Sequence, residues 1–232
     1  MSRIQASLGL FVATLLCLGM TCAQPPPVEL ATLPGPTGSE PISYLEQVQP
    51  VLENRCVVCH GCYDAPCQLQ FASYEGLDRG ATKQPIYHSS RLRAAPLTRL
   101  SIDAQTSAEW REKGFFSVVE HSNTEGYGSL LLNMLALGRA RPVTPDARLP
   151  DDFPLAIDRE LSCPTETEFE TYSREHPLGG MPYGVAPLTN REIGVLSAWV
   201  QQGAPPPPPH HRSRKQHSNR SSTGRIFSTE PR

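Results

Sequence analysis

Hydrophobic residues recur at helical spacing in a stretch that begins near Ile42. Leu45, Val48 and Leu52 are three or four residues apart, which places them on one face of a helix ending near residue 55. Pro50 lies inside this pattern, so either the helix kinks there or a second helix begins with the proline in its first turn. The pattern therefore predicts one or two amphipathic helices before residue 56.

The clearest helical pattern is in residues 189–203. Thr189 and Glu192 have the spacing of a capping box, and Gly203 marks the end of the helix. Its apolar stripe consists of Ile193, Leu196, Trp199 and Val200. We expect this helix to pack against the N-terminal one, so that the fold is mainly α with a core built from both ends of one domain.

The stretch between these helices is rich in glycine and proline and predicts only short elements. Helices are expected at residues 74–79, 107–119, 129–137 and 166–174, and a strand at 96–103. Residues 129–137 are apolar nearly all round, which is typical of a buried helix.

The N-terminus has the pattern of a secretory signal. Arg3 is followed by an apolar segment from Leu8 to Met20 and by small residues at Thr21-Cys22-Ala23. The apolar segment is shorter than the roughly 20 residues of a membrane-spanning helix, although an uncleaved anchor is the alternative. We therefore predict a signal peptide at residues 1–23 and export to the periplasm.

Proline and charge divide the remainder of the chain. Residues 24–41 form a Pro/Gly-rich spacer, residues 42–204 the folded domain, and residues 205–232 a disordered basic tail. The net charge of the chain is −2, but the tail carries +5, which leaves −7 on residues 1–204. An acidic body of this kind does not suggest a nucleic-acid-binding protein.

Cys56-Val57-Val58-Cys59-His60 follows the first predicted helix. Two cysteines three residues apart with a histidine directly after them form the attachment signature of c-type haem. The sequence therefore predicts one covalent haem c, with Cys56 and Cys59 as thioether attachments and His60 as the proximal ligand and metal-binding residue.

A metal-binding alternative comes from two further cysteines. Cys56, Cys59, Cys62 and Cys67 could supply four thiolates to zinc or to an iron–sulfur cluster. Cys67 is one residue too far along for the ferredoxin spacing, so this reading ranks below haem. If haem takes two thiols, a Cys62–Cys67 disulfide is expected, and Cys163 is then left without a partner.

Met181 is the candidate distal ligand of the haem iron. It lies in Gly179-Gly180-Met181-Pro182, shortly before the last helix, where small c-type cytochromes carry an axial methionine. His88, His121 and His176 are the alternatives. Because Met181 lies far beyond His60, we expect an insertion of about residues 62–165 within a cytochrome c-like domain.

Several motifs include or follow the haem signature and are more specific than it. They are the run from Arg55 to Leu69, then Gly76-Leu77-Asp78-Arg79-Gly80-Ala81, Thr98-Arg99-Leu100, Asp103-Ala104-Gln105, Ala108-Glu109-Trp110-Arg111 and Gly179-Gly180-Met181-Pro182-Tyr183-Gly184. Together they resemble the bacterial fatty acid cis/trans isomerases over about residues 42–204. Members of that family are several times longer, so we expect the chain to be an N-terminal portion that stops matching near Ala204.

The resemblance implies a periplasmic haem enzyme that converts cis to trans double bonds in the unsaturated acyl chains of membrane phospholipids. It implies the same roles for Cys56, Cys59 and His60 as the haem signature. The catalytic residues beyond the haem ligand stay unassigned. The rival hypothesis is a periplasmic cytochrome c that passes electrons to a redox partner, which the haem signature and two helices would satisfy without the resemblance.

Overall fold

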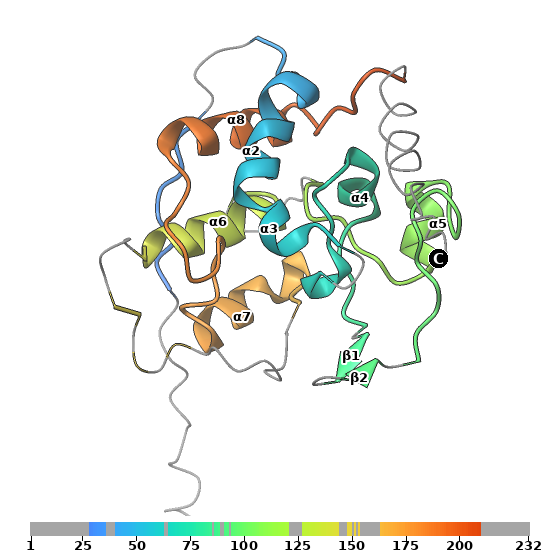
Figure 1. The fold of residues 1–232 in the computed structure, drawn as a ribbon. Coiled ribbons are helices and arrows are strands. Elements are labelled where there is room, and N and C mark those ends of the chain that lie inside the picture. The colour runs from blue at the N-terminus through green and yellow to red at the C-terminus, as the bar shows by residue number, and fades with distance from the viewer. Residues whose placement is uncertain are drawn as a thin grey trace, which may run out of the picture.

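The computed structural model describes residues 28–35, 40–62, 65–84, 86–88, 91–92, 94–120, 127–143, 148–149, 151, 153 and 163–209. Within them the fold is mainly helical, with short helices (Figure 1). Most buried apolar residues form one main core, and Ala104, Trp110 and Phe115 form a smaller second cluster. The predicted signal peptide, most of the basic tail and parts of the central stretch lie outside the described residues.

The N-terminal helix is divided into three consecutive pieces. They are η1 (Tyr44–Val48), α2 (Gln49–Arg55) and α3 (Val57–His60). Ser43 caps the first piece by accepting a hydrogen bond from the Glu46 amide. Pro50 lies in the first turn of α2, which agrees with the second of the two alternatives, a new helix that begins with the proline in its first turn. Val48 and Leu52 are fully buried, as their spacing predicts.

The C-terminal helix α8 (Asn190–Gln201) packs against this N-terminal segment, as predicted (Figure 1). Its N-terminus has the expected capping box between Thr189 and Glu192. The Trp199 ring lies 5.7 Å from that of Tyr44, and Gln202 Oε1 accepts a hydrogen bond from the Ile42 amide. The two ends of the domain are therefore joined by both apolar and polar contacts.

The most buried helix comes from the region that we expected to be an insertion. Helix α6 (Leu130–Ala140) is buried along residues 130–137 and belongs to the same core as Leu52 and Trp199. The expected helix is confirmed there. Its burial follows from its nearly uniform apolar surface, which needs neighbours on all sides. The central stretch therefore contributes to the core that the two terminal helices share.

The remaining elements are short. They are η2 (Pro66–Gln68), α4 (Tyr74–Arg79), β1 (Tyr87–His88), β2 (Arg91–Leu92), α5 (Ser107–Glu112), η3 (Glu166–Glu168) and α7 (Phe169–Glu175). Helix α5 stops well before residue 119, because Gly114 follows with a φ of 84°.

The predicted strand at residues 96–103 is absent, and this prediction is wrong. The segment turns instead, since Asp103 accepts hydrogen bonds from the backbone and the guanidinium of Arg99. A loose alternation of apolar residues could not reveal this local closure.

Part of the predicted spacer packs on the core. Leu33 is buried, and the Tyr127 hydroxyl accepts from the Leu33 amide and donates to the Ala31 carbonyl. Among the described residues, no helix has the length and apolar character needed to cross a bilayer.

Candidate haem site

The two thiols of the haem signature lie at the start of a single helical turn and within it. Cys59 lies in α3 and is exposed, while Cys56 occupies the N-cap position without a side-chain capping hydrogen bond and is partly buried. Neither forms a disulfide. Val58 between them is 85% exposed, so apolar surface lies beside the thiols. Free thiols with adjacent apolar surface fit the covalent attachment of a porphyrin edge.

Burial raises the pKa of the Cys56 thiol to about 12, and the nearby Arg55 guanidinium offsets only part of this effect. The thiolate is the reactive form of cysteine, so Cys56 in the folded chain is a poor nucleophile at neutral pH.

His60 is buried, and a hydrogen bond to a backbone carbonyl orients its imidazole. Its Nδ1 lies 3.1 Å from the Leu69 carbonyl oxygen, and its ring packs edge-on against Phe71 with 5.4 Å between ring centroids. Burial lowers the pKa of His60, which favours the neutral imidazole. With Nδ1–H donating to Leu69, Nε2 is the nitrogen that carries the lone pair for a metal. The residues present therefore fit an axial haem ligand at His60.

The segment that carries Leu69 is fastened to the haem signature at several points. The Phe71 amide donates to the His60 carbonyl at 2.8 Å, and the Gln70 side chain donates to the Gly61 carbonyl at 3.3 Å. These bonds place residues 69–71 against the end of α3.

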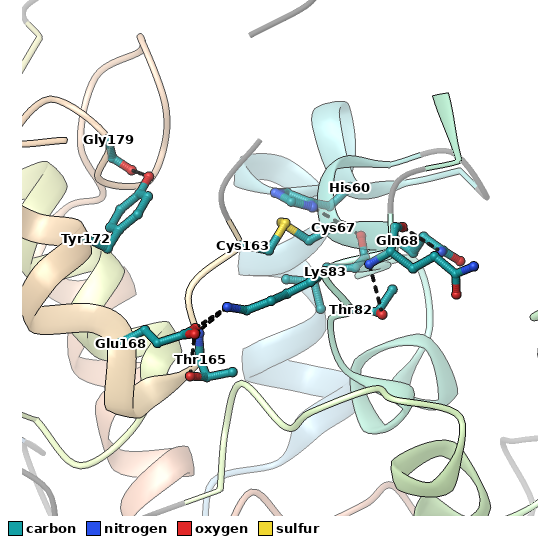
Figure 2. The surroundings of a disulfide bond; sticks show 12 residues. His60, Cys67, Gln68, Thr82, Lys83, Cys163, Thr165, Glu168, Tyr172 and Gly179 are labelled. Carbon is teal, nitrogen blue, oxygen red and sulfur yellow. Dashed lines mark hydrogen bonds and ion pairs between the residues drawn. A yellow bond between two sulfur atoms is a disulfide. The ribbon is translucent and has the colours of Figure 1, made fainter. Parts of the chain in front are cut away.

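Cys67 forms a disulfide with Cys163 across 96 residues of sequence (Figure 2). The expected Cys62–Cys67 disulfide is therefore wrong, and Cys163 has a partner. Sequence proximity favoured Cys62, but the fold brings the segment before α7 against η2, where Cys163 reaches Cys67. A disulfide at Cys67 also removes that thiol from the four-cysteine metal site. The described residues contain no group of three or more histidine, cysteine or acidic side chains that could hold a metal ion.

A second contact joins the same two segments. The Lys83 ammonium pairs with the Glu168 carboxylate, which also accepts from the Thr165 amide (Figure 2). These bonds lower the pKa of Glu168 to about 2, with the Lys83 hydrogen bond as the largest cause.

Met181 lies in the loop between α7 and α8. Its amide donates to the Met134 carbonyl of α6 at 2.9 Å, and its side chain packs on the core. The backbone approach is close, since a Cβ on Gly138 would lie 2.3 Å from the Met181 carbonyl oxygen. These contacts are with α6, whereas those of His60 are with residues 69 and 71. The sixth ligand therefore stays a prediction.

Arg55 connects the same loop to the haem signature. Its guanidinium donates to the carbonyls of Ala186 and Pro187, both at 2.9 Å, and lies 3.7 Å from the Glu192 carboxylate. Because Arg55 directly precedes Cys56, the loop that follows Met181 is held beside the end of α2 (Figure 1).

The structure describes the side chain of only one of the three histidines that were alternatives to Met181 as the distal ligand. His176 is exposed and packs on the Tyr172 ring, at 5.0 Å between centroids. The side chain of His88 and all of His121 lie outside what the structure describes. Sequence reasoning did not identify the Leu69 carbonyl as the partner of His60, because a backbone acceptor has no residue signature.

The other side of the Met181 loop borders a cavity of about 220 Å³. Its apolar lining includes Leu137, Phe153, Leu178 and Val185, and Arg141 and Arg148 add positive charge. Arg148 pairs with Asp151 at 2.6 Å, and both side chains are largely exposed. One loop thus lines a cavity with both apolar and positively charged residues and also contacts the residue before the haem signature.

Comparison with known proteins gives one family. The sequence model of the fatty acid cis/trans isomerase (CTI) family matches residues 95–229. No curated protein and no solved structure matches. The match begins beyond the haem signature and continues past Ala204, so the prediction that the resemblance ends near Ala204 is wrong. The abrupt change in composition there therefore carries no information on family membership.

The family description agrees with the resemblance that the sequence motifs predict. The matched residues include the motifs from Thr98 onward, but not the run from Arg55 to Leu69 or the motif at residues 76–81. Because the match covers more than half of the 232 residues, the chain belongs to the fatty acid cis/trans isomerase family.

Proposed function

We propose that this family member is a periplasmic isomerase with one covalent haem c. Cys56 and Cys59 would hold the porphyrin, and His60 would be the proximal ligand. The proposal rests mainly on the hydrogen bond between His60 Nδ1 and the Leu69 carbonyl, because it leaves Nε2 for iron. A mainly helical domain whose terminal helices bracket the signature supports a cytochrome c-like fold.

The proposed substrate is the cis-unsaturated acyl chain of a membrane phospholipid, and the product is the trans isomer. An oxidised haem iron, when bound, supplies an electron-withdrawing centre that lowers the order of a nearby C=C bond and permits rotation without net redox change. The chain's own contribution is to hold His60 in one tautomer and to place the acyl chain. Met181 is the proposed distal ligand.

We propose that part of the acyl chain lies in the cavity bordered by the Met181 loop. Leu137, Phe153 and Val185 offer an apolar lining, which suits methylene groups. The volume of about 220 Å³ is below the roughly 300–1,000 Å³ of sites that enclose a whole small molecule, so a segment of the chain would be held. Arg141 carries a positive charge at the cavity and complements a lipid phosphate.

The function is tested with the exported, haem-loaded chain and phospholipid vesicles that contain cis-monounsaturated acyl chains. Fatty acids are released after incubation and separated by gas chromatography. We expect trans isomers with the wild-type chain and none with the Cys56→Ala/Cys59→Ala variant. Absence of trans product from a wild-type chain that carries haem would refute the isomerase proposal and favour electron transfer.

A further inference from the structure

The two residues before Leu69 have an unusual backbone conformation. Cys67 has a φ of 59° and Gln68 a φ of 51°, so two consecutive residues with Cβ atoms lie in the left-handed region. Such residues are strained and persist only where the surroundings fix them. The contacts that hold them therefore determine where the next carbonyl, that of Leu69, points.

Cys67 is held from two sides. Its sulfur is bonded to Cys163, and its carbonyl accepts a hydrogen bond from the Thr82 amide at 2.9 Å (Figure 2). These contacts fix the position of the residue that enters the strained turn.

Gln68 is held by its side chain, which is 2% exposed. Its Oε1 accepts from the Thr98 hydroxyl at 2.8 Å, and its Nε2 donates to the Gln84 carbonyl at 3.2 Å. A buried amide that lost either partner would be left unsatisfied at considerable cost. The side chain therefore prevents rotation of the turn.

Arg79 completes this arrangement. Its guanidinium donates to the carbonyls of Gln68 and of Thr98, the latter at 2.8 Å. It is 1% exposed and lies over the Phe115 ring at 5.2 Å and the Trp110 ring at 5.8 Å. A buried guanidinium is costly unless its donors are used, so these bonds strongly favour a single arrangement of residues 68 and 98.

We propose that Gln68, Thr98, Arg79 and the Cys67–Cys163 disulfide are positioning elements for the axial histidine. They hold the Leu69 carbonyl where it accepts from His60 Nδ1, and so set the tautomer and basicity of the imidazole. The inference rests on the proposed haem function, since only a metal-bound His60 converts this geometry into a property of the iron.

Thr98→Val is the most selective test. The change removes the hydroxyl that bonds Gln68 and preserves the side-chain shape and the carbonyl that Arg79 uses. Thr98→Ser restores the hydroxyl. Lys83→Gln is the control, because it removes the Lys83–Glu168 pair, which lies near the Cys67–Cys163 disulfide and does not contact Gln68 or Thr98.

The measured quantity is the midpoint reduction potential of the haem-loaded chain, with circular dichroism as the check on folding. A weaker bond to Leu69 makes His60 less basic and stabilises ferric iron less. We expect a higher potential for Thr98→Val and wild-type values for Thr98→Ser and Lys83→Gln. The Cys67→Ala/Cys163→Ala pair should also raise the potential.

Two results would overturn the inference. One is an unchanged potential in Thr98→Val, and the other is an equal shift in Thr98→Val and Lys83→Gln, which would indicate general loosening. If the wild-type chain carries no haem, the proposed function fails separately. Nitrogen NMR of the haem-free chain then measures the tautomer of His60, which reports whether the Leu69 carbonyl still orients its ring. The inference predicts an Nδ1–H tautomer that Thr98→Val depopulates, and identical tautomers in both chains would refute it.

Discussion

Removal of the Cys67–Cys163 disulfide should strongly destabilise the folded chain. The bond closes a loop across 96 residues of sequence. In the chain-entropy treatment, a disulfide that closes a loop of this length raises the free energy of the unfolded state by about 4.7 kcal/mol at 25 °C. Residual structure in the unfolded chain makes the measured loss smaller than this value. We therefore expect the Cys67→Ala/Cys163→Ala variant to lose about 2–4 kcal/mol of unfolding free energy.

Urea titration monitored by tryptophan fluorescence measures this loss. Trp110 and Trp199 are both buried, so both rings report unfolding of the domain. The unfolding free energy is extrapolated linearly to zero urea for the wild-type chain and the variant under non-reducing conditions.

Cys62→Ala is the matched control, because Cys62 is exposed and does not pair with Cys67 in the structure. It should leave the unfolding free energy within about 0.5 kcal/mol of wild type. A loss below about 1 kcal/mol in the double variant would contradict the reasoning. Equal destabilisation by Cys62→Ala would indicate the alternative pairing, which non-reducing peptide mapping would identify directly.

Three further outcomes are expected. Met181→Ala should abolish the weak red absorption band of methionine-bound ferric haem, and an unchanged band would exclude Met181 as a ligand. Val185→Trp should fill the cavity and weaken binding of the fluorescent fatty acid cis-parinaric acid, whereas Ile102→Trp, at another exposed apolar residue, should not; equal effects would exclude the cavity. The pKa of Glu168 is lowered to about 2, so the ionised carboxylate stabilises the fold above about pH 4.5, and this stabilisation is lost as pH falls toward 2. Glu168→Gln should therefore lose less unfolding free energy between these pH values than the wild-type chain. Identical acid titrations of the two chains would contradict this.

Much of the helical fold could be predicted because the relevant signals are local. The Thr189–Glu192 capping box and the apolar stripe after it define α8 from a few neighbouring residues. Pro50 likewise marked the place of a kink or a new helix, and α2 begins there. Local periodicity could not show that residues 96–103 close a turn through Asp103, because one ion pair outweighs a weak alternation of apolar residues.

The candidate site was predictable where it depends on residue types and not where it depends on long-range contacts. The haem signature predicts haem-binding roles for Cys56, Cys59 and His60 from spacing alone, and these roles stay predictions. The partner of Cys67 could not be found in this way, since 96 residues of sequence separate it from Cys163 and only the folded chain brings them together. The Leu69 carbonyl is likewise invisible in sequence, because every residue carries one.

Intact mass spectrometry of the mature chain, purified after export, tests the central claim most directly. The account predicts a single species whose mass exceeds that of the polypeptide by one haem, and tryptic mapping should place the addition on the peptide that contains Cys56 and Cys59. A mature chain of bare polypeptide mass, produced in cells that load other c-type cytochromes, would contradict the account.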